Sequence, residues 1–159
     1  MDKQLSLNDI FKAAMQMEAI GGAFYRKYAQ VSGDPEIEKI FNSLAIMEES
    51  HFNKFQAMIE ALKPEEAGKG ISKENRGYVT KTINEVVFNE DRKPENLLQR
   101  VSSKQDALKI ALELENGSIS YYEKMKQEVA PEAAKEIDRI IGEEQGHAQT
   151  ITSLLENLA

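Results

Sequence analysis

Residues 41–62, FNSLAIMEESHFNKFQAMIEAL, and residues 137–158, IDRIIGEEQGHAQTITSLLENL, carry the same pattern. Apolar residues recur at steps of three and four, and in each stretch a glutamate followed three residues later by a histidine interrupts them. Glu48 and His51 in the first stretch are matched by Glu144 and His147 in the second, at an offset of 96 residues. Steps of three and four place these side chains on one stripe of a helix. Each stretch therefore predicts a helix whose buried face carries a glutamate and a histidine.

A second matched pair of stretches lies upstream, at an offset of 97 residues. Each shows a helical stripe of apolar or small residues that contains a single glutamate. The stripes are Phe11, Ala14, Glu18, Gly21, Tyr25 and Tyr28 in one stretch and Leu108, Ala111, Glu115, Ser118, Tyr122 and Met125 in the other. Matched glutamates in both repeats make a chance arrangement far less expected than either pair alone.

Capping residues and prolines predict a first helical hairpin over residues 6–63. Ser6 is placed to cap a helix that runs to about residue 32, where Gly33 ends it. Asp34 then caps a second helix, with Pro35 in its first turn, and this helix ends near residue 63, before Pro64. Because only a few residues join the two helices, we expect them to be antiparallel.

The same signals predict a second hairpin over residues 103–159. Ser103 with Asp106 three residues on resembles a capping box for a third helix that reaches about residue 129, and Pro131 opens the fourth helix. We therefore expect an all-α four-helix bundle that forms a single domain over residues 1–159.

The segment between the hairpins, residues 64–102, is long enough to run the whole length of the bundle, since a helix of some 26 residues measures about 40 Å. Val79, Ile83, Val86 and Val87 suggest a short helix packed on the bundle, followed by a polar stretch over residues 89–100. We interpret this crossover as structural and assign no chemistry to it.

Four carboxylates on buried faces require positive charge nearby, because desolvating even one ionised carboxylate costs several kcal/mol. Two divalent cations would cancel these charges. Glu48 and Glu144, each one helical turn from a histidine, are suited to bridge two metal ions. Terminal ligands would be Glu18 and Glu115, with one nitrogen each from His51 and His147. Carboxylate with imidazole suits iron or manganese, with zinc as an alternative, and helix bundles that hold two such ions show this ligand set.

At these residues the chain resembles the ferritin-like superfamily and, within it, the rubrerythrin diiron domain. The resemblance covers both hairpins and rests on Glu18, Glu48-Glu49-Ser50-His51, Glu115 and Glu144-Gln145-Gly146-His147. It implies two iron ions per chain. It also implies that Tyr25 and Tyr122, seven residues after Glu18 and Glu115, form hydrogen bonds within the metal site, although both could instead be core aromatics. Glu49 and Glu143 point about 100° away from the site stripe and are expected on a solvated face.

Two departures from the rubrerythrin pattern bear on function. Full-length rubrerythrins carry a cysteine-ligated rubredoxin iron centre that supplies electrons, whereas this chain has no cysteine. Typical members also have an extra glutamate one turn after the third-helix ligand, where this chain has Ser118, with Gly21 at the symmetric position. The missing cysteine therefore predicts an external electron donor, such as a rubredoxin-like protein. Ser118 predicts a slower reaction with peroxide than typical members of that family show.

Composition narrows the partners and the location. A net charge of −7 argues against nucleic acid or anionic membrane as a partner. Residues 1–12 have no continuous apolar core and no later segment approaches a membrane span, so we expect a cytoplasmic protein. The absence of cysteine excludes disulfides, thiolate catalysis and iron–sulfur sites within the chain.

Three functions remain open. The first is an oxidoreductase whose two ferrous ions reduce hydrogen peroxide, with dioxygen as the other oxidant to consider. The second is oxidation and handling of ferrous iron, and the third is a helical interaction module that the metal only stabilises. Because members of the resembled family are often dimers, some with exchanged hairpins, we expect a homodimer.

Overall fold

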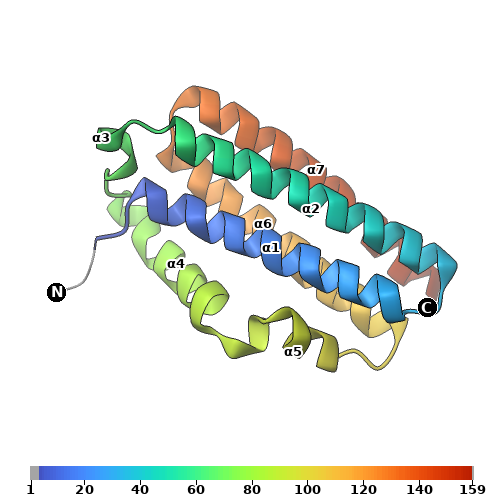
Figure 1. The fold of residues 1–159 in the computed structure, drawn as a ribbon. Coiled ribbons are helices and arrows are strands. Elements are labelled where there is room, and N and C mark those ends of the chain that lie inside the picture. The colour runs from blue at the N-terminus through green and yellow to red at the C-terminus, as the bar shows by residue number, and fades with distance from the viewer. Residues whose placement is uncertain (1–3, 159) are drawn as a thin grey trace.

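Four long helices lie side by side in the computed structural model and form a bundle (Figure 1). They are α1 (Leu7–Val31), α2 (Pro35–Ala61), α6 (Lys104–Met125) and α7 (Pro131–Leu158). The structure describes residues 4–158, and within that range it contains no β-strand. The all-α prediction is confirmed.

The first hairpin begins and turns where its capping residues predicted. The hydroxyl of Ser6 accepts a hydrogen bond from the backbone N–H of Asp9, and the Asp9 carboxylate accepts one from the Ser6 N–H. Gly33 between α1 and α2 has a φ of 68°, a conformation that favours glycine. The carboxylate of Asp34 then accepts hydrogen bonds from the N–H groups of Glu36 and Ile37 and caps α2.

The second hairpin begins with a cap that differs in detail from the prediction. Ser103 accepts a hydrogen bond from the Asp106 N–H at 3.1 Å, as a capping box requires. The Asp106 carboxylate, however, bonds the N–H and hydroxyl of Ser102 rather than returning to Ser103. A short 3-10 turn, Lys126–Glu128, follows α6 and leads to α7.

The crossover runs along the bundle beside α1, from the end that carries α4 to the end that carries α5 (Figure 1). It contains α3 (Pro64–Ala67), α4 (Lys73–Ile83), a π-helical turn (Asn84–Phe88), a 3-10 turn (Glu90–Arg92) and α5 (Pro94–Gln99). Residues 89–100, which were expected to be a polar stretch, contain the short helix α5. One side chain of this helix, Leu97, is buried in the core.

One of the four apolar crossover residues does not face the bundle. Val79 and Val86 are buried as expected, but Val87 is 49% exposed and the prediction for it was wrong. Adjacent residues on a helix point about 100° apart, so Val86 and Val87 cannot share the buried face.

Two apolar clusters fill the bundle, and the predicted ligands lie between them in every long helix. In α1, for example, Phe11 and Ala14 belong to one cluster and Phe24 to the other, with Glu18 between them. In α7, Ile141 and Ile151 flank the Glu144 turn in the same way. A polar layer thus crosses the middle of an otherwise apolar core. No helix within residues 4–158 has both the length and the apolar character needed to cross a membrane.

Candidate metal centre

The four long helices bring all six predicted ligands into one cluster. The first group of side chains whose ligand atoms lie within 4.8 Å of one another is Glu18, Glu48, His51 and Glu144. The second is Glu48, Glu115, Glu144 and His147. Because Glu48 and Glu144 belong to both groups, they lie where two metal ions could share them. This arrangement is the one that the bridging hypothesis requires; the ligand roles themselves stay a prediction.

Burial and missing hydrogen-bond partners show that the donor set fits a metal site. The four glutamate side chains are at most 3% exposed. Each still has one buried oxygen that finds no hydrogen-bond partner within residues 4–158, and Nδ1 of His147 likewise finds none there. An unpaired buried polar atom costs free energy, and such atoms are rare in native proteins unless an ion or water satisfies them. Four unpaired oxygens and one unpaired nitrogen, gathered at one place, are what bound cations would satisfy.

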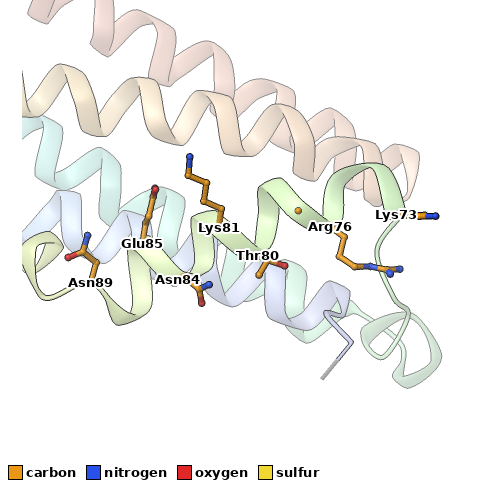
Figure 2. Close-up of a pocket in the computed structure, with 8 residues that line it drawn as sticks. Lys73, Arg76, Thr80, Lys81, Asn84, Glu85 and Asn89 are labelled. Atoms are coloured by element: carbon orange, nitrogen blue, oxygen red, sulfur yellow. The ribbon is translucent and has the colours of Figure 1, made fainter. Parts of the chain in front are cut away.

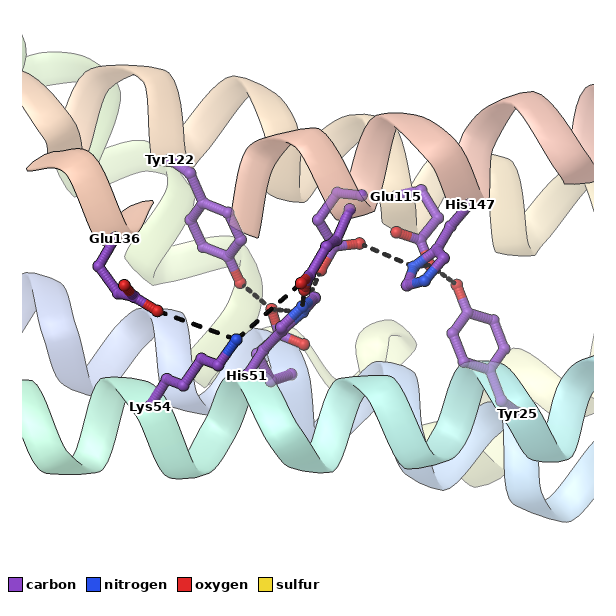
Figure 3. Close-up of polar contacts among 10 residues, drawn as sticks. Tyr25, His51, Lys54, Glu115, Tyr122, Glu136 and His147 are labelled. Atoms are coloured by element: carbon purple, nitrogen blue, oxygen red, sulfur yellow. Dashed lines mark hydrogen bonds and ion pairs between the residues drawn. The ribbon is translucent and has the colours of Figure 1, made fainter. Parts of the chain in front are cut away.

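Two tyrosines hold the terminal glutamates from the opposite hairpin. The Tyr25 hydroxyl on α1 donates to Oε1 of Glu115 on α6 at 2.8 Å. The Tyr122 hydroxyl on α6 donates to Oε1 of Glu18 on α1 in a short hydrogen bond. Figure 3 shows both phenol rings pointing into the cluster. Burial raises the pKa of both hydroxyls, so they remain donors across the physiological pH range.

Without metal, the cluster holds protons. Burial raises the pKa of Glu18 well above its ordinary value, although a hydrogen bond with Glu48 opposes it. Burial and the charge of Glu18 do the same to Glu48. The raised pKa values favour the protonated forms of Glu18 and Glu48 in the metal-free protein, and cations must displace such protons on binding.

Glu144 behaves differently because it faces both histidines. Burial alone would raise its pKa, but contacts with His147 and His51 outweigh burial and lower it. The pKa of His51 is raised, because its bonds to Glu144 and Glu143 outweigh burial. Nδ1 of His51 lies 2.8 Å from Oε1 of Glu144, which makes a buried ion pair at the centre of the cluster.

A carboxylate that the sequence placed in solvent also contacts the cluster. Oε2 of Glu143 lies 2.5 Å from Nε2 of His51, and the Glu143 side chain is only 37% exposed. Lys54 lies 4.0 Å from Glu143 and 3.9 Å from Glu136, which closes a chain of charges from α2 to α7 (Figure 3). The prediction for Glu143 was wrong, since a rotation of about 100° away from the site stripe still leaves this residue facing α2. Glu49 is solvated as expected, because its side chain is 65% exposed.

The opposite face of the cluster borders a small cavity of about 30 Å³ between α1, α6 and the crossover. Ser118, which stands where the resembled family has an extra glutamate, and Gly21 at the symmetric position line it together with Glu48 and Glu115. Val86 and Arg92 of the crossover also line this cavity. The crossover therefore covers the site, a role that the sequence had not shown.

A side chain at position 21 would crowd the carboxylate of Glu48. A Cβ on Gly21 would come within 3.0 Å of Oε2 of Glu48, closer than such atoms normally approach. Glycine inside a helix costs roughly 0.5–1 kcal/mol relative to alanine. The glycine thus gives up helix stability and leaves room for a carboxylate.

A larger hollow, of about 800 Å³, lies on the outer side of α4 and contains none of the six predicted ligands (Figure 2). Lys73, Arg76 and Lys81 project around it, with Glu85 beside them. Its size does not connect it with the buried carboxylates, so we assign it no part in the chemistry.

Comparisons with known proteins bear on the fold and the family of the chain. The chain is similar in structure to a protein of Thermotoga maritima described as a ferritin-like diiron-carboxylate protein, with a TM-score of 0.75, 20% sequence identity and 100% of both chains covered. At this identity the likeness establishes the ferritin-like fold. No curated protein matches the chain. The family model for rubrerythrin matches residues 9–155. The expected resemblance is confirmed, and the chain belongs to the rubrerythrin family.

Proposed function

We propose that this chain is a diiron carboxylate oxidoreductase that reduces hydrogen peroxide. The observation that carries the proposal is the pair of interlocking ligand groups that share Glu48 and Glu144. Two ferrous ions, when bound, supply the two electrons that convert one peroxide and two protons into two molecules of water. Terminal carboxylates from Glu18 and Glu115, with a nitrogen from His51 and one from His147, would complete the set.

The protein side chains prepare the site for this reaction in two ways. Tyr25 and Tyr122 fix the orientation of the terminal carboxylates by hydrogen bonds from the opposite hairpin. The apolar clusters on both sides exclude bulk water from the polar layer. Low polarity strengthens each electrostatic contact inside the site.

The cavity beside Gly21 and Ser118 is the proposed place for the oxidant. It adjoins both a shared carboxylate, Glu48, and a terminal one, Glu115. A water molecule needs at least about 10–15 Å³ of such space, so about 30 Å³ has room for the two oxygens of one peroxide. Arg92 lies at this cavity and offers hydrogen-bond donors to an oxygen-rich guest.

The electrons for turnover must come from outside these 159 residues, because the chain has no cysteine to hold a rubredoxin centre. We propose an external donor, such as a rubredoxin-like protein. On the strength of the family resemblance we further propose a homodimer, which light scattering of the purified protein tests. We also propose that the protein works in the cytoplasm.

Oxidation and handling of ferrous iron is the second candidate. His147 is 16% exposed, which leaves a route by which iron could reach the site and leave it. An iron oxidase would consume many equivalents of ferrous iron per chain and accumulate a ferric product, whereas a peroxide reductase would not.

Anaerobic loading with ferrous iron, followed by rapid mixing with peroxide or with dioxygen, separates these functions. We expect oxidation by peroxide to be much faster, and turnover to continue when a reductant is supplied. Comparable rates with both oxidants and no turnover would contradict the peroxidase.

Substitutions at Ser118, where the rubrerythrin pattern has a glutamate, provide a second test of the peroxide reaction. Ser118→Glu should accelerate the peroxide reaction if a missing carboxylate slows it, while Ser118→Ala, which adds no ligand, serves as the matched control. Equal rates in the two variants would show that position 118 does not set the rate.

A further inference from the structure

The two histidines occupy symmetric positions in the repeat but differ in their surroundings. The His51 side chain is fully buried, and Glu143 bonds its outer nitrogen, Nε2. His147 is 16% exposed, and its Nδ1 has no hydrogen-bond partner within residues 4–158. Its Nδ1 lies 3.7 Å from both Glu115 and Glu144.

A groove of about 420 Å³ between α2 and α7 reaches His147. Its walls include Ile40, Leu44, Met47 and Thr150. Glu36 and Lys39 also line the groove and bring one charge of each sign, so charge neither blocks it nor favours entry of a cation. The groove therefore reaches a partly exposed candidate ligand of the metal centre.

The repeat explains why one end is closed and the other is open. At the offset of 96 residues, Glu143 corresponds to Met47, Lys54 to Thr150 and Glu136 to Ile40. The first member of each pair belongs to the charge chain beside His51. The second members all line the groove beside His147. Three charged residues thus close one end, and their three uncharged counterparts leave the other end open.

We propose that the groove is the route of metal exchange, so that the ion beside His147 enters and leaves readily while Glu143 and Lys54 retain the one beside His51. Glu143 acts as a positioning residue. By accepting the Nε2 proton of His51, it keeps Nδ1 turned inward for the metal, and outer partners of this kind typically change metal affinity about 10–100-fold. The inference rests on the two-metal site of the proposed function but not on any reaction with peroxide.

Release of iron to a chelator tests the proposal without measuring activity. The protein is loaded anaerobically with ferrous iron, its metal content is measured, and an excess of a ferrous chelator is added while the colour of the complex is followed. We expect two phases of equal amplitude with rates that differ about 10-fold or more. A metal content below about two per chain would overturn the site and this inference together. With both ions present, a single phase would overturn the inference alone.

Paired substitutions identify which end is which. Met47→Glu with Thr150→Lys copies the charged network onto the groove, and we expect it to slow the fast phase about 10–100-fold. Glu143→Met with Lys54→Thr removes the network, and the slow phase should accelerate by a similar factor. Each pair leaves net charge unchanged, so the two variants control for one another.

Circular dichroism and metal content verify that the variants fold. If the second pair fails to fold, the first still decides the matter. A fast phase that Met47→Glu with Thr150→Lys leaves unchanged would exclude the groove as the route.

Discussion

The two hairpins contribute the same ligand types and a matching tyrosine, yet they differ at several other positions around the ligands. Each supplies two glutamates and a histidine from the same helical positions. Around these ligands, Gly21 in the first hairpin corresponds to Ser118 in the second, and Met47 corresponds to Glu143. The two hairpins have identical residues at the six candidate ligand positions. They have different residues along the cavity and the groove through which we propose that a small molecule or an ion approaches. Separate residues thus set the number of ligands and the access to them. A substitution can therefore change one of these properties without changing the other.

The largest effect should come from removing a shared carboxylate. Glu48→Ala or Glu144→Ala should lower metal content at both positions, because each residue belongs to both ligand groups. Glu18→Ala or Glu115→Ala should spare one position. Elemental analysis after iron loading measures the difference. If the shared and terminal variants lose metal equally, the two halves do not share ligands as their geometry suggests.

Metal should stabilise the protein more as pH rises. In the metal-free protein, folding raises the pKa of Glu18 and of Glu48 above the unfolded value near 4.5. The stability that these two protonated groups contribute is fully present below about pH 4.5. It is lost as the pH rises through their pKa in the folded protein. Bound cations replace those protons. The gain in unfolding temperature should therefore grow between about pH 5 and about pH 8, reaching roughly 10 °C at saturating metal.

Thermal unfolding with and without metal at several pH values checks this. His51 acts in the same direction, since its pKa is also raised, whereas Glu144, with a lowered pKa, adds stability that is lost only in stronger acid. A metal-free protein that is as heat-stable as the loaded one near neutral pH would contradict the expectation.

Gly21→Ala should separate metal binding from stability. The substitution should raise the stability of the metal-free protein by roughly 0.5–1 kcal/mol through helix propensity. It should also weaken metal binding, because the new Cβ displaces the Glu48 carboxylate. Gly142→Ala on α7, where a Cβ meets nothing within 4 Å, is the control that should give the first effect alone. Denaturant unfolding and metal titration measure the two quantities. Unchanged affinity in Gly21→Ala would show that the carboxylate can shift freely.

The smallest effect on metal binding should come from the tyrosines. Tyr25→Phe and Tyr122→Phe should leave the fold and the metal content nearly intact while changing the oxidation rate or the visible spectrum of the oxidised site. The loss of one buried hydrogen bond costs about 1–3 kcal/mol. Tyr121→Phe is the control, because that hydroxyl donates to the backbone oxygen of Ile10 at 2.8 Å. Identical spectra in all three variants would show that Tyr25 and Tyr122 are core aromatic residues with no influence on the metal site.

Helical period and caps were enough to predict the hairpins and to bring Glu18, Glu48, His51 and their counterparts together. Those features act along one helix or across a short turn, so sequence spacing describes them well. The role of Glu143 was missed because it depends on how α2 and α7 pack, which no single-helix pattern contains. A signal was present all the same: Glu143 and Lys54 are positions where the repeat breaks.

The crossover was understood least. Its apolar residues correctly predicted contact with the bundle, yet nothing in their order showed which part of the bundle they cover. The π-helical turn at Asn84–Phe88 adds to the difficulty, because such turns are rare and change the direction of the side chains that follow. Val86 and Arg92 line the cavity beside Gly21 and Ser118, although they belong to a segment whose sequence resembles a linker.

The division of ligands between the hairpins also bears on the order of folding. Each hairpin pairs helices that are neighbours in sequence, which costs little loop-closure entropy, whereas contacts between α1 and α6 join residues about 90 positions apart. Neither ligand group is complete within one hairpin, since His51 needs Glu144 and His147 needs Glu48. We therefore expect the hairpins to form first and the ions to act as a late clamp that resists separation of the two halves. Hydrogen exchange should then slow on metal binding mainly at amides whose exposure requires the halves to part.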